Sequence, residues 1–191
     1  MLTPWGYEVE YLPAILTIEE FNTLTANRWA SDPLAEQAVL AASAAIRNYC
    51  GWHVAPAVTC KATVPGGGRM LHLPFMGVTS VSVSIEGVEL PSTAYDWRRE
   101  GIVRRIDGLW WPCRWGSVVV EATAGYEADA ILKQVVVQLA GNAIAAPLGV
   151  KEEHAGQVGI SYNTTNGIAG GISLTARDMA CLAPYRVEGV A

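Results

Sequence analysis

The sequence predicts an α+β fold, in which a small helical bundle carries an inserted antiparallel β module between its first long helix and its second. Three observations predict it. Apolar residues, many of them alanine, recur at helical spacing up to residue 50. The period then changes to two over residues 54–126, with Gly and Pro between the short runs. A long, almost uncharged helical pattern begins directly after residue 126.

Four helices are expected, at about residues 17–26, 32–50, 129–145 and 174–183. Thr17 and Glu20 form a capping-box pattern at the start of the first. Asp32 is a good N-cap for the second, with Pro33 at its first position. Asp129 caps the third, and Ser173 or Thr175 caps the last.

The β module is expected over residues 54–126, with about six short strands. A Pro65–Gly68 turn lies between its first two strands, and Glu86–Gly87 and Glu100–Gly101 are hairpin signals. The expected strands are Val58–Val64, Met70–Leu73, Val78–Ile85, Val88–Leu90, Tyr95–Trp97, Ile102–Ile106 and Val118–Ala124.

The remaining segments are less regular. Residues 1–16 show no period and predict an arm that docks on something. Residues 155–172 are rich in glycine and uncharged, which predicts a flexible loop, although 158–162 could form a strand. Residues 187–191 are expected to be a loose tail, and residues 17–186 a single domain.

The third helix is apolar around more than half of its circumference. The uncharged segment 134–150 has the minimum length of a membrane span, but its amides Gln134, Gln138 and Asn142 would be costly in hydrocarbon. A buried helix of a soluble protein is therefore expected. Such a helix must be covered nearly all round, and a neighbouring subunit is one possible cover. The candidate subunit-packing residues are Val135, Leu139 and Ala143.

Composition favours an assembly component. Charged residues make up 16% of the chain, against about 25% in ordinary globular proteins, so part of the surface is expected to face protein. The net charge is −5, and the arginines, of which Arg98, Arg99, Arg104, Arg105 and Arg114 are nearest to one another, form no basic stripe. Tight nucleic-acid binding is therefore disfavoured. The four cysteines are widely spaced and no signal peptide is seen, which predicts free thiols in a cytosolic protein.

Four tryptophans, Trp97, Trp110, Trp111 and Trp115, fall within the β module. They could plug the end of the module, anchor a protein partner or stack on the bases of RNA. Packing in the module is the favoured interpretation, and a partner contact comes next. Trp110, Trp111 and Trp115 are accordingly the candidates for a partner or packing patch.

No catalytic motif is found: there is no G-x-S-x-G, no H-E-x-x-H and no Walker A sequence. Cys50 and His53 have a spacing that could bind zinc, but no second ligand pair follows. Glu152, Glu153 and His154 fit a solvated turn better than an acid–base cluster. No enzyme activity, cofactor or metal is expected.

The order of short motifs resembles that of a known family. In sequence they are Asn48–Trp52, Leu71–Pro74, Val78–Val81, Gly87, Tyr95–Trp97, Gly101–Val103, Trp111–Pro112 and Val118–Tyr126. This arrangement resembles the head–tail connector (adaptor) proteins of long-tailed bacteriophages, often called gp6-like, with relatives in prophages and gene transfer agents. The resemblance covers about residues 17–186.

The resemblance implies a homo-oligomeric ring, usually twelve-fold, beneath the portal at the virion neck, made in the cytoplasm of the host bacterium. The ring would extend the channel through which DNA passes without specific binding, and would present a platform for a stopper or tail-completion protein. It implies no membrane partner, no active site, and subunit contacts through the helices at 32–50 and 129–145. The implied portal contacts lie in the C-terminal segment, at Leu174, Met179, Leu182, Tyr185 and Arg186.

An alternative from a different class remains open. A monomeric β-rich binding module could use the tryptophan cluster to bind a small ligand or single-stranded nucleic acid. Salt-sensitive quenching of tryptophan fluorescence by an oligonucleotide would favour this alternative.

Overall fold

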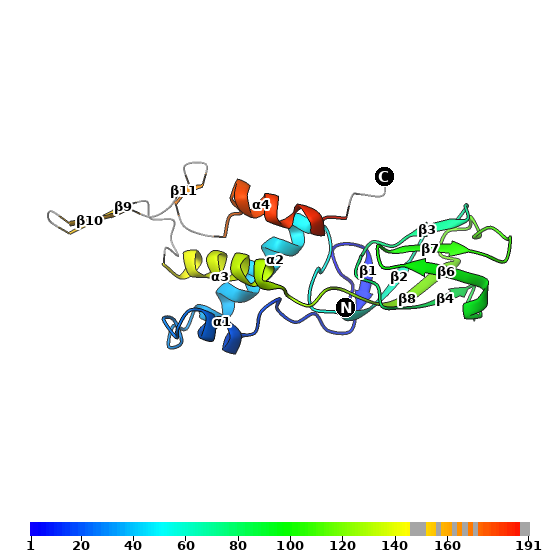
Figure 1. The fold of residues 1–191 in the computed structure, drawn as a ribbon, viewed down its shortest axis with the longest axis horizontal. Coiled ribbons are helices and arrows are strands. Elements are labelled where there is room, and N and C mark those ends of the chain that lie inside the picture. Colours follow the sequence, from blue (N-terminus) through cyan, green and yellow to red (C-terminus); the bar gives the residue numbers. More distant parts are fainter. Residues whose placement is uncertain (146–151, 156–157, 162–163, 166–167, 170–171, 188–191) are drawn as a thin grey trace. The chain divides into compact units, whose positions relative to one another are not determined.

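The computed structural model describes residues 1–145, 152–155, 158–161, 164–165, 168–169 and 172–187. It confirms the predicted α+β class, with helices and antiparallel sheets (Figure 1). The chain divides into two compact units. Of the described residues, the β unit comprises 1–13, 51–127 and 187, and the helical unit comprises 14–50 and those between 128 and 186. That residues 17–186 act as one domain stays a prediction.

A five-stranded antiparallel sheet forms the larger part of the β unit, in the order β1-β2-β8-β4-β5. Its strands are β1 (Tyr7–Val9), β2 (Val58–Thr63), β4 (Ser80–Ile85), β5 (Val88–Glu89) and β8 (Val118–Ala124). Burial alternates along β8, as expected for a strand with one face on the core. Residues such as Cys60, Val83 and Val120 are 0% exposed on the inner face, and hydroxyl and charged side chains occupy the outer face.

A second sheet has three strands in the order β3-β7-β6: β3 (Met70–His72), β6 (Tyr95–Arg98) and β7 (Ile102–Arg105). A short 3-10 helix, η1 (Ser92–Ala94), precedes β6. Leu71 and Val103 are buried on the inner face, and the Tyr95 hydroxyl donates to the carbonyl of Val81 in β4, 3.1 Å away. The two sheets therefore share one core.

Both predicted β hairpins are present, and the predicted turn at Pro65–Gly68 lies between strands of different sheets. The strands on either side of Glu86–Gly87 and Glu100–Gly101 pair as expected. The strands on either side of Pro65–Gly68 do not pair, because β2 lies between β1 and β8 while β3 pairs with β7 in the other sheet. The segment therefore crosses from one sheet to the other.

The N-terminal arm docks on this chain's own sheet. Its strand β1 pairs with β2, so that Tyr7 lies opposite Ala62 and Val9 opposite Cys60. Tyr7 and Val9 are 1% and 2% exposed. A segment without a visible period is thus an edge strand of the β unit.

The helical unit contains α1 (Ile18–Leu24), α2 (Ala35–Cys50), α3 (Ala130–Ala145) and α4 (Ala176–Leu182), followed by the 3-10 helix η2 (Ala183–Tyr185). Capping boxes are present at Thr17 with Glu20 and at Thr175 with Asp178. The Asp129 carboxylate accepts a hydrogen bond from the Leu132 N–H, 2.9 Å away, and thereby caps α3 as predicted. Helix α2 begins at Ala35, three residues after the predicted cap.

Helix α3 is covered mainly by its own chain. Val135 and Leu139, predicted to pack between subunits, are 4% and 1% exposed, and Ala143 is half-buried. Helices α2 and α3 pack against each other, and Gly141 lies so close to Trp29 that an added Cβ would be 3.0 Å from the ring. The amides of Gln134, Gln138 and Asn142 lie on the exposed side. Val135 and Leu139 therefore belong to the core of the helical unit, not to a free surface.

Part of the predicted loop at 155–172 forms strands. Strand β9 (Glu152–Ala155) pairs with β10 (Val158–Ser161), and β11 (Thr164–Thr165) pairs with β12 (Ile168–Ala169). The remainder of that predicted loop, apart from residue 172, and residues 188–191 of the predicted tail lie outside the described residues. Within the described part of the chain, no helix has the length and hydropathy needed to span a membrane.

Candidate interaction surfaces

Trp111 is a core residue of the β unit. Its side chain is 1% exposed, its Nε1 donates to the Arg69 carbonyl at 3.1 Å, and the Arg105 guanidinium lies 5.2 Å from the ring centroid. Its backbone also pairs with Gly67 and Gly68. Of the three patch candidates, Trp111 therefore serves packing.

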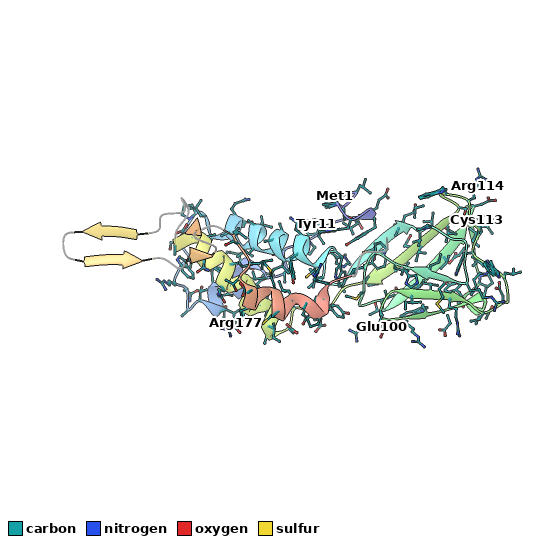
Figure 2. All side chains as sticks on the ribbon, turned by 90° about the horizontal axis from the view of Figure 1, so that it is seen from above. Met1, Tyr11, Glu100, Cys113, Arg114 and Arg177 are labelled. Carbon is teal, nitrogen blue, oxygen red and sulfur yellow. The ribbon has the colours of Figure 1, made fainter. Side chains whose placement is uncertain are left out.

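Trp110 and Trp115 are exposed in the same loop, to 64% and 88%. Ile106 and Leu109 are exposed as well, to 52% and 59%. We call these four residues the apolar tip. Cys113 and Arg114 lie in the same loop, at the end of the β unit away from Met1 (Figure 2). A cluster of large exposed apolar side chains is typical of a contact with another protein.

Hydrogen bonds hold the loop of the apolar tip in place. The Asp107 carboxylate accepts from the Arg105 guanidinium and from the Leu109 N–H, and the Ser117 hydroxyl donates to the Arg114 carbonyl at 2.6 Å. The hydrogen bond from Arg105 lowers the pKa of Asp107. The exposed tryptophans are thus presented on a structured loop.

The C-terminal segment is docked on the helical unit. Leu182, a predicted portal contact, is 0% exposed and lies in the core of the unit. The Tyr185 hydroxyl donates to Asp129 at 2.5 Å, and the Arg186 guanidinium lies 5.2 Å from the centroid of the Tyr49 ring. Leu182 is therefore a correction to the predicted contacts, because its side chain has no free surface.

The other predicted portal residues keep some accessible surface. Leu174 and Tyr185 are half-buried, Met179 is 39% exposed, and Arg186 is exposed. The Tyr49 hydroxyl donates to the Met179 carbonyl, 3.1 Å away, which fixes the backbone of α4. A role of these residues in portal binding stays a prediction.

Two carboxyls of the helical unit, those of Glu20 and Asp129, predict a dependence of stability on pH. The Lys133 ammonium, 2.7 Å from Glu20, lowers the pKa of that carboxyl. Burial raises the pKa of Asp129, but hydrogen bonds from Leu132 and Tyr185 outweigh it and the pKa is lowered. A carboxyl whose pKa is lower in the folded state stabilises the fold above its unfolded pKa of about 4, and this stabilisation is lost as the pH falls through the folded value.

We expect the double substitution Glu20→Gln with Asp129→Asn to reduce the free energy of unfolding at pH 7 by about 1 kcal/mol, since both contacts are partly exposed. At pH 3 the difference from the wild type should be smaller, because the stabilisation is lost as the pH falls through the lowered pKa values of the folded state. Urea unfolding at both pH values measures it. An equal difference at pH 3 and pH 7 would show that charge is not the cause.

The possible zinc ligands are engaged in the fold. His53 is 0% exposed; its Nε2 lies 2.9 Å from the Ala124 carbonyl and its Nδ1 lies 2.8 Å from the Tyr7 hydroxyl. Both ring nitrogens thus have hydrogen-bond partners. Burial raises the pKa of the Cys50 thiol to about 12, with an opposing effect of Arg186, so the thiolate form that binds metal is disfavoured. All four cysteines are free thiols.

Within the described residues, no group of three or more His, Cys, Asp or Glu side chains could hold a metal ion. Glu152, Glu153 and His154 lie in β9, and their side chains are outside the description. The candidate surfaces for contacts with other proteins are the apolar tip, the C-terminal segment and the outer faces of the two sheets.

Comparison with solved structures finds a chain of similar fold in "Neck of empty GTA particle computed with C6 symmetry", where GTA denotes a gene transfer agent. The TM-score is 0.64, the match covers 97% of this chain and 97% of that chain, and 18% of the aligned residues are identical. No protein-family model matches the sequence, and no curated protein matches it. The chain is thus an α+β protein with the fold of a particle-neck chain.

Proposed function

We propose that this protein is a structural head–tail adaptor of a tailed bacteriophage or related particle, located at the neck. The observation that carries the proposal is the similarity of fold to a chain from the neck of a gene transfer agent, over 97% of both chains. A match of that extent includes both the helical and the β unit. The protein would work through interfaces, without catalysis and without a cofactor.

The proposed assembly is a ring beneath the portal that extends the DNA channel. The similar neck was computed with sixfold symmetry, and a chain that lies off such an axis occurs in multiples of six copies. Twelve copies, the number implied by the family resemblance, satisfy this condition. The net charge of −5 suits a channel through which DNA moves, since DNA is retained by cations that neutralise its phosphates.

The C-terminal segment is the proposed portal contact, through Leu174, Met179, Tyr185 and Arg186. Leu182, the last residue of α4, would support this surface from the core, because its side chain is fully buried. The apolar tip is the proposed platform for the stopper or tail-completion protein. Aromatic side chains that are exposed in the free protein and buried on docking often carry most of the binding energy of an interface.

The alternative function, binding of a small ligand or single-stranded nucleic acid, has less support. Stacking of successive bases needs several exposed rings and a basic groove, whereas Trp111 is buried. Addition of an oligonucleotide at low salt should therefore leave tryptophan fluorescence unchanged. Quenching that disappears at moderate salt would favour the alternative.

Electron microscopy of tagged particles tests the proposed location. A short peptide tag inserted at Ala26–Asn27, an exposed turn after α1, should be labelled by gold-conjugated antibody at the head–tail junction. Labelling of the capsid shell or the tail tip, or tag-positive cell extracts whose purified particles lack the protein, would contradict the proposal.

A further inference from the structure

The five-stranded sheet of the β unit carries a predominantly negative outer face. Glu8, Lys61 and Glu121 lie side by side on β1, β2 and β8, and next to Glu121 lies Ser82, whose hydroxyl donates to Glu89. A hollow of about 270 Å³ is lined by Glu8, Lys61, Glu121 and also Glu10. We call Glu8, Glu10, Lys61, Glu89 and Glu121 the acidic face. This face carries four negative carboxylates against two positive groups, the ammonium of Lys61 and the terminal ammonium of Met1. The Met1 ammonium donates a hydrogen bond to the Val9 carbonyl.

The three-stranded sheet carries a positive and partly apolar outer face. Two rows of neighbours cross it: Met70, Arg104 and Asp96 form one row, and His72, Ile102 and Arg98 form the other. A hollow of about 150 Å³ is lined by Met70, Asp96, Arg98, Ile102 and Arg104, together with Trp97. We call the six residues of the two rows the basic face.

The arginines of the basic face are available to an external partner. Arg98 and Arg104 are exposed, and neither forms a salt bridge within the described part of the chain. Met70, beside Arg104, is 53% exposed. A surface with two unneutralised guanidinium groups around an apolar hollow fits a partner that offers carboxylates.

We propose that the basic face of one copy docks on the acidic face of the next copy in the ring. The inner faces of both sheets share one core, so the two outer faces point away from it and cannot meet within one copy. A contact between two different surfaces of identical chains is heterologous, and such contacts form a ring when the rotation from copy to copy closes. The charges on the two faces are complementary, which favours this pairing and fixes its orientation. This inference rests on the proposed ring.

A second copy fits the basic face better than DNA does. The face has only two arginines, and Asp96 lies in the same row as Arg104, so its net positive charge is small. Met70 and Ile102 line the hollow between the two arginines and would gain nothing from a sugar–phosphate backbone. Duplex DNA is usually held by several unopposed cations.

The proposal is tested by reversing the charges of one face and then restoring complementarity by reversing those of the other face as well. The yield of rings is measured from the mass of the complex that each variant forms with the portal of the same virus. We expect Arg98→Glu with Arg104→Glu to reduce the yield of rings at least about tenfold, because like charges then face each other. Glu10→Lys with Glu121→Lys should do the same. The four substitutions combined should restore most of the yield. Arg28→Glu, an exposed charge reversal on the helical unit outside the C-terminal segment, should leave the yield unchanged.

Thermal unfolding verifies that each variant is folded. If a charge-reversal variant does not fold, Arg98→Gln with Arg104→Gln is used in its place. This variant should give a lower yield of rings than the wild type, and that yield should no longer depend on salt concentration. Normal assembly of the folded reversal variants, loss without rescue, or an equal loss in the control would overturn the proposal. The proposal would also be overturned if the reversal variants of the basic face formed normal rings whose particles no longer retained DNA. That result would show that the basic face contacts DNA. A wild-type protein that forms no ring with the portal would instead contradict the proposed function.

Discussion

Replacing Trp111 by alanine is expected to lower the free energy of unfolding of the β unit by about 3–5 kcal/mol, as is usual for a large aromatic residue removed from a core. The ring is 1% exposed, and its loss would also remove the hydrogen bond from Nε1 to the Arg69 carbonyl and the contact with Arg105. Urea unfolding followed by circular dichroism measures the change without depending on tryptophan fluorescence.

Trp115→Ala is the matched substitution in the same loop. Because Trp115 is 88% exposed, its removal should change stability by less than about 0.5 kcal/mol. Together with Trp110→Ala it should instead weaken docking of the stopper or tail-completion protein, with Tyr11→Ala, exposed to 73%, as a control away from the loop. A stability loss for Trp115→Ala as large as that for Trp111→Ala would show that the tip is packed in the free protein.

Tyr7→Ala is expected to have the second large effect, again about 3–5 kcal/mol. Tyr7 is 1% exposed, and its ring packs edge-on against Phe75, with centroids 5.2 Å apart. Its hydroxyl also holds His53. The Ala124 carbonyl can only accept a hydrogen bond, so Nε2 of His53 carries the proton and Nδ1 of His53 accepts from the Tyr7 hydroxyl. The Tyr7 hydroxyl oxygen in turn accepts a hydrogen bond from the backbone N–H of His53, 3.0 Å away.

Tyr7→Phe separates the hydroxyl from the ring. It keeps the packing but leaves two buried groups of His53 without the Tyr7 hydroxyl, which should cost about 1–3 kcal/mol. Deletion of residues 1–9 should resemble Tyr7→Ala, and Tyr11→Ala should be nearly neutral. Unchanged unfolding after the deletion would contradict the assignment of the arm to the β unit.

Local signals in the sequence were sufficient to predict α1, α2, α3 and α4 and the β hairpins at Glu86–Gly87 and Glu100–Gly101. Capping at Thr17, Asp129 and Thr175 depends on residues within three positions of one another, and a two-residue turn fixes its own hairpin. The pairing of β1 with β2 joins segments more than fifty residues apart. A three-residue strand is too short to show a period, so nothing near Tyr7 could reveal its partner.

The burial of individual side chains was the second feature that could not be predicted from the sequence. Trp110 and Trp111 are neighbours in the sequence, yet one side chain is 64% exposed and the other 1%. Deciding which one faces the core requires the position of Arg69 and Arg105. Leu182 was likewise predicted as a contact because the family resemblance implies portal contacts in the C-terminal segment, whereas α4 packs its side chain into the helical unit.

The mass of the protein in solution, alone and mixed with the portal of the same virus, tests the central claim most directly. The account predicts ring-sized particles of the protein alone, or a stoichiometric complex with the portal. In either case the number of copies of the 20.4 kDa chain should be a multiple of six. A protein that stays monomeric alone and also does not bind the portal would contradict the adaptor function.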